Sequence, residues 1–379
     1  MGSPARMDWG LFVSTVFLLS CGLVMVYSTS SVVAKVQYGE TSYHFLARQA
    51  SSALLAVAFL MLLAKWDYKK LKDPRWAFAC LGVVVFLLLV VYYIDPRKRW
   101  LLLGITQLQP SELAKPAMIV FLAYFVTLRR ARINDRHTVW PAGLALFMLV
   151  AAVLAGDAGT AVVLLATAAA VFFVAGMDRR TMLISGLCAV VLVGLGIYFK
   201  GYRRDRITSF LAPAIEVLAK MDPTGTIQAP APNARTRGGD YQVRQSKIAV
   251  GSGGLWGRGL MEGRQKLLYL PEAHTDFIYA VIGEEAGLLR GTLLVLAAYF
   301  VLMWRGYSLF FIAQDEFGRY LAVGVTTCIV VQALMNMSVV LGLAPTKGIP
   351  LPLVSYGGSS LVSTLISLGL LMSVREQAG

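Results

Sequence analysis

Charged residues are scarce in this sequence, and histidine and cysteine are scarcer still. Asp, Glu, Lys and Arg make up 15% of the 379 residues, whereas a typical soluble domain has about 25%. The chain has only 3 His and 4 Cys. All four cysteines (Cys21, Cys80, Cys188 and Cys328) lie inside apolar runs, and none has a partner at metal-ligand spacing. These shortages exclude a soluble enzyme, a disulfide scaffold and a metal site built from His and Cys.

Hydrophobic residues, by contrast, make up 57% of the chain, and they lie in long runs without charge such as 83–91, 143–155 and 158–177. Because about 20 consecutive apolar residues cross a bilayer as a helix, the pattern predicts an all-α polytopic membrane protein with about ten transmembrane helices. The predicted spans are 9–29, 46–65, 77–94, 110–128, 139–156, 158–177, 182–199, 276–304, 318–341 and 353–374. Residues 200–275 then form a large extracytoplasmic loop between the seventh and eighth helices.

Lys and Arg cluster in the short loops at 65–75, 129–136 and 179–180, which all lie on one side of the predicted bundle. The positive-inside rule makes that side cytoplasmic, with both termini there and the large loop outside. The net charge of +14 therefore favours membrane lipids over nucleic acid as a partner. Residues 1–6 resemble a cloning remnant, and residues 7–379 are expected to form a single membrane domain without a cleavable signal sequence.

The large loop divides into two parts of different composition. Residues 211–239 are rich in Pro, Ala, Gly and Thr and are expected to be mobile, whereas 240–275 mix glycine with basic and aromatic residues. Glycines beside Arg258 and Lys266 could clasp a phosphate through backbone N–H groups and cations. The alternative is a flexible surface loop. Asp276 follows at the headgroup boundary, where it is well placed to act as a general base.

The fourth predicted helix carries two ionisable residues at membrane depth. Pro110 suits a first helical position, and Glu112 and Lys115 are three residues apart on one helix face. Pro116 should leave a backbone carbonyl without its helical donor. Glu112 and Lys115 could form an ion pair that only neutralises itself, or they could contact a substrate.

Three further features lie between or at the ends of spans. Asp157 lies between two glycines, where it could cap a helix or face a cavity. Three prolines from 345 to 352 predict irregular backbone that lines a cavity or is buried. Lys347, within that segment, could bind an anionic headgroup or only extend to the interface. Glu284 and Glu285 are expected to balance Arg290 or hold the eighth span in register.

Taken together, four segments resemble the SEDS family (shape, elongation, division and sporulation proteins), the ten-span membrane glycosyltransferases of bacterial wall synthesis. These segments are QPSELAK at 109–115, the glycine-rich run from Ser252, PEAHTDFIYAVIGEE at 271–285 and PTKGIPLPLVSYGGSS at 345–360. The PEAHTDFI and PTKG forms are more similar to the division branch (FtsW) than to the elongation branch (RodA). The chain departs from the family at Asp157, which Ala155 and Gly156 precede where Gln-Pro is usual.

The resemblance implies an enzyme that polymerises lipid II, a disaccharide-pentapeptide on undecaprenyl diphosphate, at the outer face of the inner membrane. It implies that Asp276 is the catalytic base and that a class B penicillin-binding protein is a partner. Arg258, Lys266 or a divalent cation (Mg²⁺ or Mn²⁺) would stabilise the diphosphate. The candidate substrate-binding residues are Trp100, Glu112, Lys115, Asp157, Arg258, Lys266, His274, Lys347 and Ser355. A lipid II flippase and a division scaffold are the alternatives.

Overall fold

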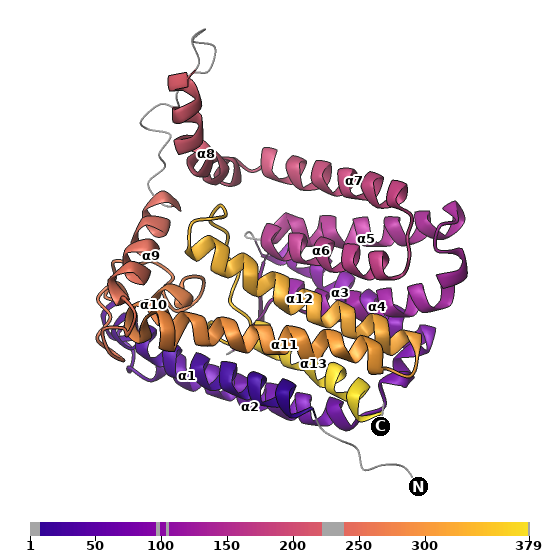
Figure 1. Ribbon diagram of the computed structural model, residues 1–379, viewed down its shortest axis with the longest axis horizontal. Helices are drawn as coiled ribbons and strands as arrows, with labels where there is room; N and C mark the ends of the chain where they lie inside the picture. The colour runs from indigo at the N-terminus through magenta and orange to yellow at the C-terminus, as the bar shows by residue number, and fades with distance from the viewer. Residues whose placement is uncertain (1–7, 96–98, 104–105, 222–238, 378–379) are drawn as a thin grey trace.

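The computed structural model describes residues 8–95, 99–103, 106–221 and 239–377, and most of these residues are helical (Figure 1). The helices are α1 (Trp9–Tyr38), α2 (His44–Lys65), η1 (Tyr68–Lys72), α3 (Pro74–Ile94), α4 (Pro110–Arg129), η2 (Arg130–Arg132), α5 (Arg136–Gly156), α6 (Ala158–Val174), α7 (Arg179–Tyr198), α8 (Gly201–Met221), α9 (Gly239–Gly253), α10 (Ile278–Gly287), the π-helical turn η4 (Leu288–Thr292), α11 (Leu293–Ile312), α12 (Glu316–Val340) and α13 (Gly358–Glu376). The strands β1 (Leu101–Leu103) and β2 (Thr106–Leu108) pair antiparallel, with Leu101 opposite Leu108.

The described residues contain nine helices that are long and apolar enough to cross a membrane, and the shorter apolar helix α6. These ten segments correspond to the ten predicted spans. The first helix is longer than predicted, since it continues to Tyr38 before Gly39 ends it in a left-handed conformation. The predicted eighth span is α10, η4 and α11 together.

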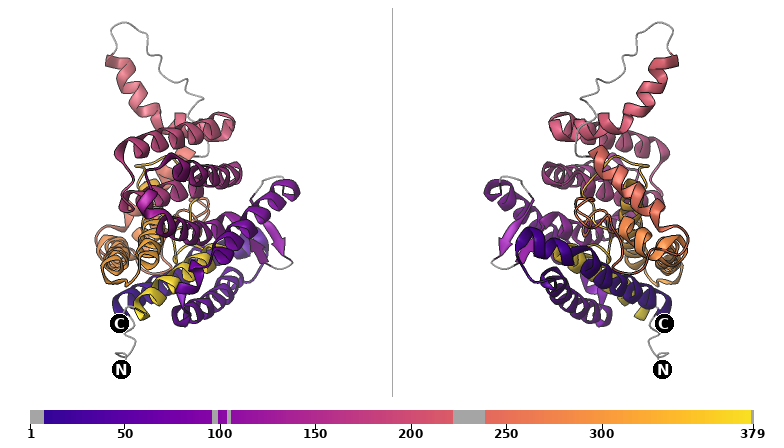
Figure 2. Two further views of the ribbon diagram at one scale, coloured as in Figure 1. Left: turned by 90° about the vertical axis from the view of Figure 1, so that its right-hand side faces the viewer. Right: turned by 90° about the vertical axis from the view of Figure 1, so that its left-hand side faces the viewer.

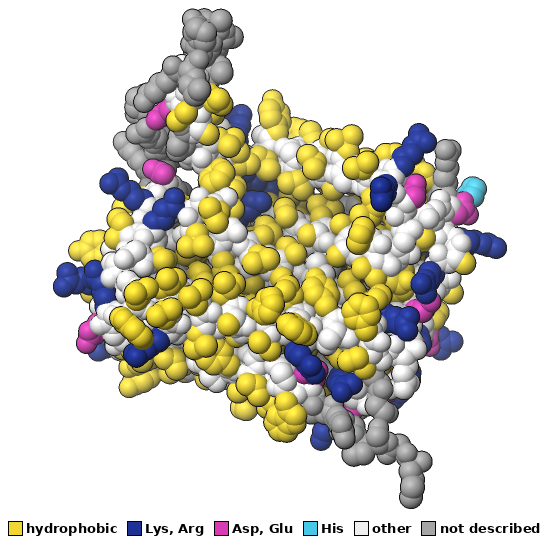
Figure 3. Space-filling model, viewed as in Figure 1, with side chains coloured by type: hydrophobic (Ala, Val, Ile, Leu, Met, Phe, Trp, Pro, Cys, Tyr) yellow, Lys and Arg dark blue, Asp and Glu magenta, His cyan; other side chains and the backbone are white. Residues whose placement is uncertain are grey.

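Buried residues are concentrated in α4, α12 and α13, which form the centre of the bundle. α13 packs against α2, and α12 packs against α4, α6 and α11. In contrast, α7 has no buried residue and lies at the edge of the bundle (Figure 1). Exposed hydrophobic side chains cover the middle of the molecule, while Lys and Arg gather toward its two ends (Figure 3). This distribution suits a membrane around the middle.

The start of α1 and the end of α13 lie at one end of the bundle, which is called the terminal end below (Figure 1). An ion pair of 2.6 Å between Asp8 and Arg305 joins α1 to α11 there. α8, α9 and the segment that leads into α10 lie at the opposite end, called the loop end. The hairpin of β1 and β2 stands at the edge of the bundle (Figure 2).

The prediction of an irregular loop over 200–275 is wrong in part, because the segment contains the helices α8 and α9. Residues 211–221, predicted to be mobile, complete α8, whereas 222–238 lie outside the described residues.

The side chains of Arg203 and Lys200 explain how α8 attaches to the bundle. Arg203 donates to the carbonyls of Leu154 (2.9 Å) and Gly196 (3.1 Å), and Lys200 donates to that of Ala155. Residues 1–6 also lie outside the described residues.

Candidate active site

Four chain segments meet at the loop end: the link between α3 and α4, the break between α5 and α6, the irregular segment 341–357 and the residues before α10. Asp276 lies two residues before α10 begins. Gly348, in segment 341–357, lies close to both Asp276 and Arg99. A Cβ atom built on Gly348 would lie 3.2 Å from an oxygen of Asp276 and 3.6 Å from a guanidinium nitrogen of Arg99. A side chain at 348 would therefore press on the Asp276 carboxylate, which glycine avoids.

The pKa of Asp276 is raised from its usual value of 3.8 to about 7. Burial is the largest cause, because it disfavours the charged carboxylate. The negative charges of Glu272 and Asp157 raise the pKa further, whereas the cations Arg99 and Arg206 lower it. An acid with a pKa close to neutral pH is suited to accept and release a proton in a reaction.

Segment 341–357 also fixes the backbone around Asp276. The amide of Asn336 donates to the carbonyls of Asp276 and Ile349, both at 2.8 Å, and so ties the two segments to α12. Ser355 donates to the carbonyl of Thr275 at 2.5 Å, and the backbone N–H of Tyr356 donates to that of His274 at 2.9 Å. Ser355, a predicted substrate-binding residue, thus holds the catalytic candidate in position.

Asp157 caps a helix, which is one of the two roles that its sequence context left open. It is the N-cap of α6, where one carboxylate oxygen accepts from the N–H of Thr160 at 3.0 Å. The other oxygen accepts from Gln109 at 2.9 Å and lies 3.5 Å from the guanidinium of Arg99. Arg99 was missed as a site residue, since in the sequence it is one of several basic residues in a loop. Its position directly before Trp100 was the available signal.

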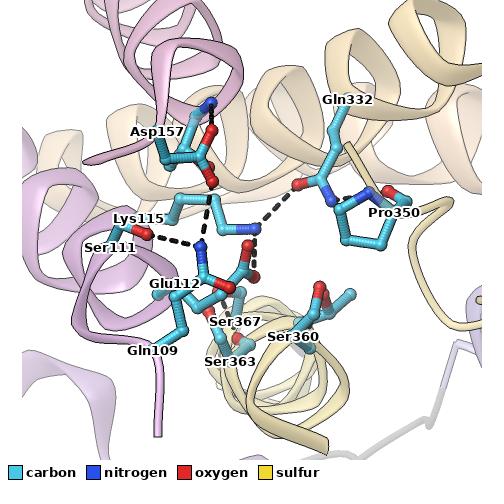
Figure 4. Close-up of polar contacts among 12 residues, drawn as sticks. Gln109, Ser111, Glu112, Lys115, Asp157, Gln332, Pro350, Ser360, Ser363 and Ser367 are labelled. Atoms are coloured by element: carbon cyan, nitrogen blue, oxygen red, sulfur yellow. Dashed lines mark hydrogen bonds and ion pairs between the residues drawn. The ribbon is translucent and has the colours of Figure 1, made fainter. Parts of the chain in front are cut away.

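Glu112 and Lys115 form a buried ion pair of 2.6 Å on α4 (Figure 4). The Lys115 ammonium also donates to Gln332 of α12 at 2.7 Å, and Gln332 donates to the carbonyl of Pro350 at 2.9 Å. The pair neutralises itself, as one of the two interpretations predicted, and it also connects α4 to the segment that borders Asp276.

Pro116 leaves the carbonyl of Glu112 without a helical donor, as predicted. Ser363 of α13 supplies the missing donor, with its hydroxyl 2.7 Å from that carbonyl (Figure 4). Both groups are buried. The carbonyl that Pro116 leaves free in α4 therefore forms a hydrogen bond that joins α4 to α13.

The glycine run after Ser252 lies against α10 and is not arranged as a phosphate clasp. A Cβ on Gly253 would lie 1.9 Å from the carbonyl oxygen of Gly283, and one on Gly257 would lie 2.2 Å from that of Glu285. Backbone N–H groups of this run donate to carbonyls of α10, for example that of Gly259 to Glu285 at 3.0 Å. The glycines therefore serve close backbone packing, which corrects the phosphate interpretation.

The two cations predicted to bind a diphosphate are also engaged in the protein. Lys266 is buried, and its ammonium lies 2.6 Å from the carboxylate of Glu285. Arg258 is more exposed and lies 3.9 Å from Glu284. The prediction that Glu284 and Glu285 balance Arg290 is wrong, because Arg290 instead lies over the ring of Trp256 at 4.8 Å.

The remaining predicted residues border the group around Asp276. Trp100 donates its backbone N–H to Asp95 at 2.8 Å, and its ring lies 5.6 Å from the guanidinium carbon of Arg99. The ring of His274 packs against those of Phe45 and Tyr356, which also contact each other, and burial lowers the pKa of His274.

Lys347 is the residue before Gly348, and its pKa is lowered by burial and by the neighbouring charge of Arg203.

Among the described residues, no group of three or more His, Cys, Asp or Glu could hold a metal ion. The cationic side chains whose charges act on Asp276 are Arg99 and Arg206.

Comparison with known proteins points to one family. Residues 9–379 match the FtsW/RodA/SpoVE family, described as a cell cycle protein. The probable peptidoglycan glycosyltransferase FtsW of Trichlorobacter lovleyi is 38% identical, over 98% of this chain and 93% of the relative. Stage V sporulation protein E of Bacillus subtilis is 37% identical, over 97% and 96%.

Solved structures agree in fold over almost the whole chain. A chain from a peptidoglycan synthase complex, in which polymerization and crosslinking are coordinated, superposes with a TM-score of 0.71 at 26% identity, covering 98% of each chain. The crystal structure of the rod shape determining protein RodA of Thermus thermophilus gives a TM-score of 0.67 at 25% identity, covering 98% of this chain and 97% of that one.

Proposed function

Because this chain belongs to the FtsW/RodA/SpoVE family of multi-pass membrane proteins, we propose that it is a peptidoglycan glycosyltransferase. Its substrate is lipid II, and its product is a glycan strand that grows at the outer face of the inner membrane. The similarity to FtsW and to a sporulation protein favours a role in division over one in elongation.

The single observation that carries this proposal is the environment of Asp276. Its carboxyl group has a pKa of about 7 and lies beside Arg99 at the loop end. A hydroxyl of the acceptor sugar attacks the anomeric carbon of the donor, and the bond from that carbon to the lipid diphosphate breaks. Asp276 takes the hydroxyl proton as the new glycosidic bond forms. The diphosphate leaves with the electron pair of the broken bond.

The leaving diphosphate carries negative charge that must be stabilised as it departs. Arg99 and Arg206, whose charges act on Asp276, and Lys347, next to Gly348 in the sequence, replace Arg258 and Lys266 in this role. Arg206 is held by a hydrogen bond of 3.3 Å to the carbonyl of Thr346, next to Lys347. The chain thus supplies both the base and the positive charge from separate segments of the loop end.

The orientation in the membrane follows from the distribution of basic residues. Three basic clusters, at 68–72, 129–132 and 179–180, lie in connections on the terminal side of the spans. The positive-inside rule therefore makes both termini cytoplasmic and the loop end, with Asp276, extracytoplasmic. Lipid II on the outer leaflet would reach Asp276 without crossing the bilayer.

A class B penicillin-binding protein is the proposed partner, because polymerised glycan must be crosslinked to form a wall. The likeness to a chain of a complex that coordinates polymerization and crosslinking supports this pairing. The partner would be a single-span transpeptidase that contacts the helix bundle from the membrane.

Transport of lipid II is the second candidate, because the ion pair of Glu112 and Lys115 is buried within the bundle, where transporters keep charged residues. It predicts faster movement of lipid II between the leaflets of reconstituted vesicles, and a slower rate once the pair is neutralised.

One experiment separates the two functions. The purified protein is incubated with lipid II, with and without a cognate transpeptidase, beside the Asp276→Ala variant. The proposal expects glycan strands from the wild type and none from the folded variant. Strands from both proteins would refute the role of Asp276, and strands from neither, together with leaflet movement of lipid II, would favour transport.

A further inference from the structure

Two consecutive residues of α10, Glu284 and Glu285, are buried carboxylates that take no part in the proposed reaction. Both face the segment 254–277, which connects α9 to α10 and ends at the catalytic candidate Asp276; it is called the anchored loop below. Buried charge is costly unless it is paired and hydrogen-bonded. This loop supplies the hydrogen-bond donors to the Glu284 carboxylate. It also supplies two of the three groups that donate to the Glu285 carboxylate.

Glu284 accepts only from the backbone of the anchored loop. The N–H of Arg264 donates to one of its oxygens at 2.8 Å, and the N–H of Gln265 donates to the other at 3.1 Å. A carboxylate that accepts two backbone N–H groups fixes the chain that supplies them, because those groups have no partner elsewhere. Gly263 makes the approach possible, since a Cβ there would lie 2.9 Å from Glu285 and 3.1 Å from Glu284.

Glu285 joins the anchored loop to α1 as well. It accepts from the N–H of Met261 at 3.1 Å and from the ammonium of Lys266 at 2.6 Å. The hydroxyl of Ser28 in α1 donates to it at 2.7 Å and accepts from Lys266 at 2.8 Å. The ion pair is fully enclosed, so removing one partner would leave an unpaired charge in the protein interior.

The backbone of the anchored loop is strained and so needs to be held. Three of its non-glycine residues, Met261, Leu268 and Glu272, have φ values of 71°, 68° and 56°. Such left-handed conformations are unfavourable for residues with a side chain and persist only where the surroundings impose them. Met261 is itself one of the residues that bond to Glu285. Glu272 lies four residues before Asp276 and is one of the charges that act on it.

We propose that Glu284 and Glu285 are positioning residues that hold the anchored loop, and through it Asp276, in the geometry that the glycosyl transfer requires. The inference rests on the proposed glycosyltransferase function. Asn336 of α12 and Ser355 of segment 341–357 hold the backbone of Asp276 and Thr275 from one side, and the two glutamates hold the chain that approaches Asp276 from the other. Loss of the anchor slows the transfer step without weakening the binding of lipid II.

The test uses a variant that removes the anchor without leaving a buried charge. Lys266→Met with Glu285→Leu replaces the ion pair by apolar side chains, which proteins commonly tolerate. Glu262→Gln is the matched control for Glu285→Gln, because Glu262 lies in the same loop, is exposed and loses the same charge. Wild type, Asp276→Ala, the control and the double variant are compared for polymerisation of lipid II and for amide hydrogen exchange.

We expect the double variant to lose at least tenfold in kcat per folded molecule, with KM for lipid II within twofold of the wild type. The amide of Met261, whose acceptor is Glu285, should exchange at least tenfold faster. The acidic limb of its pH–rate profile should move to lower pH, because water reaches Asp276 and the burial that raises its pKa is relieved. Glu285→Gln alone should show the same changes with a lower yield of folded protein.

The inference and the proposed function can fail separately. If the wild type polymerises and Asp276→Ala does not, an unchanged kcat in the double variant overturns the positioning role alone. Unchanged amide exchange overturns it as well, and that readout needs no catalytic activity. If the wild type forms no strands, the function has failed, and exchange still decides whether the glutamates hold the loop.

Discussion

Arg99 and Asp276 both approach one point, the position that a Cβ would take on Gly348. The guanidinium would lie 3.6 Å and the carboxylate 3.2 Å from that atom. They come from segments 177 residues apart in sequence, the one before α4 and the one before α10. The positive charge lowers the pKa of Asp276, while burial raises it, and the net result is a pKa of about 7. The pKa of Asp276 therefore depends on two effects of opposite sign, burial and the positive charge of Arg99.

Removing the positive charge should raise the pKa of Asp276. The base acts only when it is deprotonated, so the rate of the wild type rises with pH through about 7, and that of Arg99→Gln should rise at a higher pH. At pH 7 we expect a loss of about fivefold, which corresponds to a pKa change of about one unit from a starting value near 7. The pH–rate profile of polymerisation measures the shift, and a midpoint that stays or falls would count against the role of Arg99.

A side chain at 348 should crowd the catalytic pair. Gly348→Ala places a methyl group 3.2 Å from the Asp276 carboxylate, so the acid or the guanidinium must move. We expect at least a tenfold loss of polymerisation in a folded protein, since small displacements of reacting groups have large effects on rate. Gly82→Ala is the matched control, because a Cβ there meets nothing within 4 Å. Equal activity of the two variants would contradict the tight fit.

The contact between Ser363 and the carbonyl of Glu112 should matter only while Pro116 is present. Ser363→Ala should lower the free energy of unfolding by about 0.5–2 kcal/mol, as expected for a hydrogen bond between membrane helices. Pro116→Ala restores a backbone N–H that can donate to the same carbonyl, so the loss should shrink in that background. Unfolding in detergent measures the effect of Ser363→Ala with Pro116 present and in the Pro116→Ala background. An equal loss of unfolding free energy in the two backgrounds would disprove the coupling.

The environment that makes Asp276 a base should also destabilise the protein. A carboxyl whose pKa is raised from 3.8 to about 7 binds its proton more tightly when folded, so folding is penalised increasingly as the pH rises from about 4 to 7. Asp276→Asn carries no charge and escapes this penalty. At pH 8 we expect it to be more stable than the wild type by about 1–3 kcal/mol, with the difference vanishing near pH 4. A variant less stable than the wild type at pH 8 would contradict the burial argument.

The features that the sequence predicted are those that obey local rules. Pro110 begins α4, Glu112 and Lys115 pair at a helical spacing of three, and Asp157 caps α6. The prolines after 341 interrupt the helical pattern as expected, because a proline cannot continue a helix. Each of these follows from residues within a few positions of one another.

The features that the sequence did not predict depend on which distant segments meet. Lys266 pairs with Glu285 and Ser28 rather than with a ligand, and no pattern in the sequence identifies a partner 238 positions away. The glycine run suits close packing on α10 as well as it would suit a phosphate. Arg99 differs from its basic neighbours only in where the link before α4 places it.

The most direct test of the account is the pH dependence of lipid II polymerisation by the reconstituted wild type, with Asp276→Asn as the baseline. The account predicts a rate that rises through a single midpoint near pH 7, and a baseline that is flat and near zero. A wild-type rate that does not change between pH 5.5 and 8.5, or an Asn variant that keeps the midpoint, would contradict Asp276 as the base.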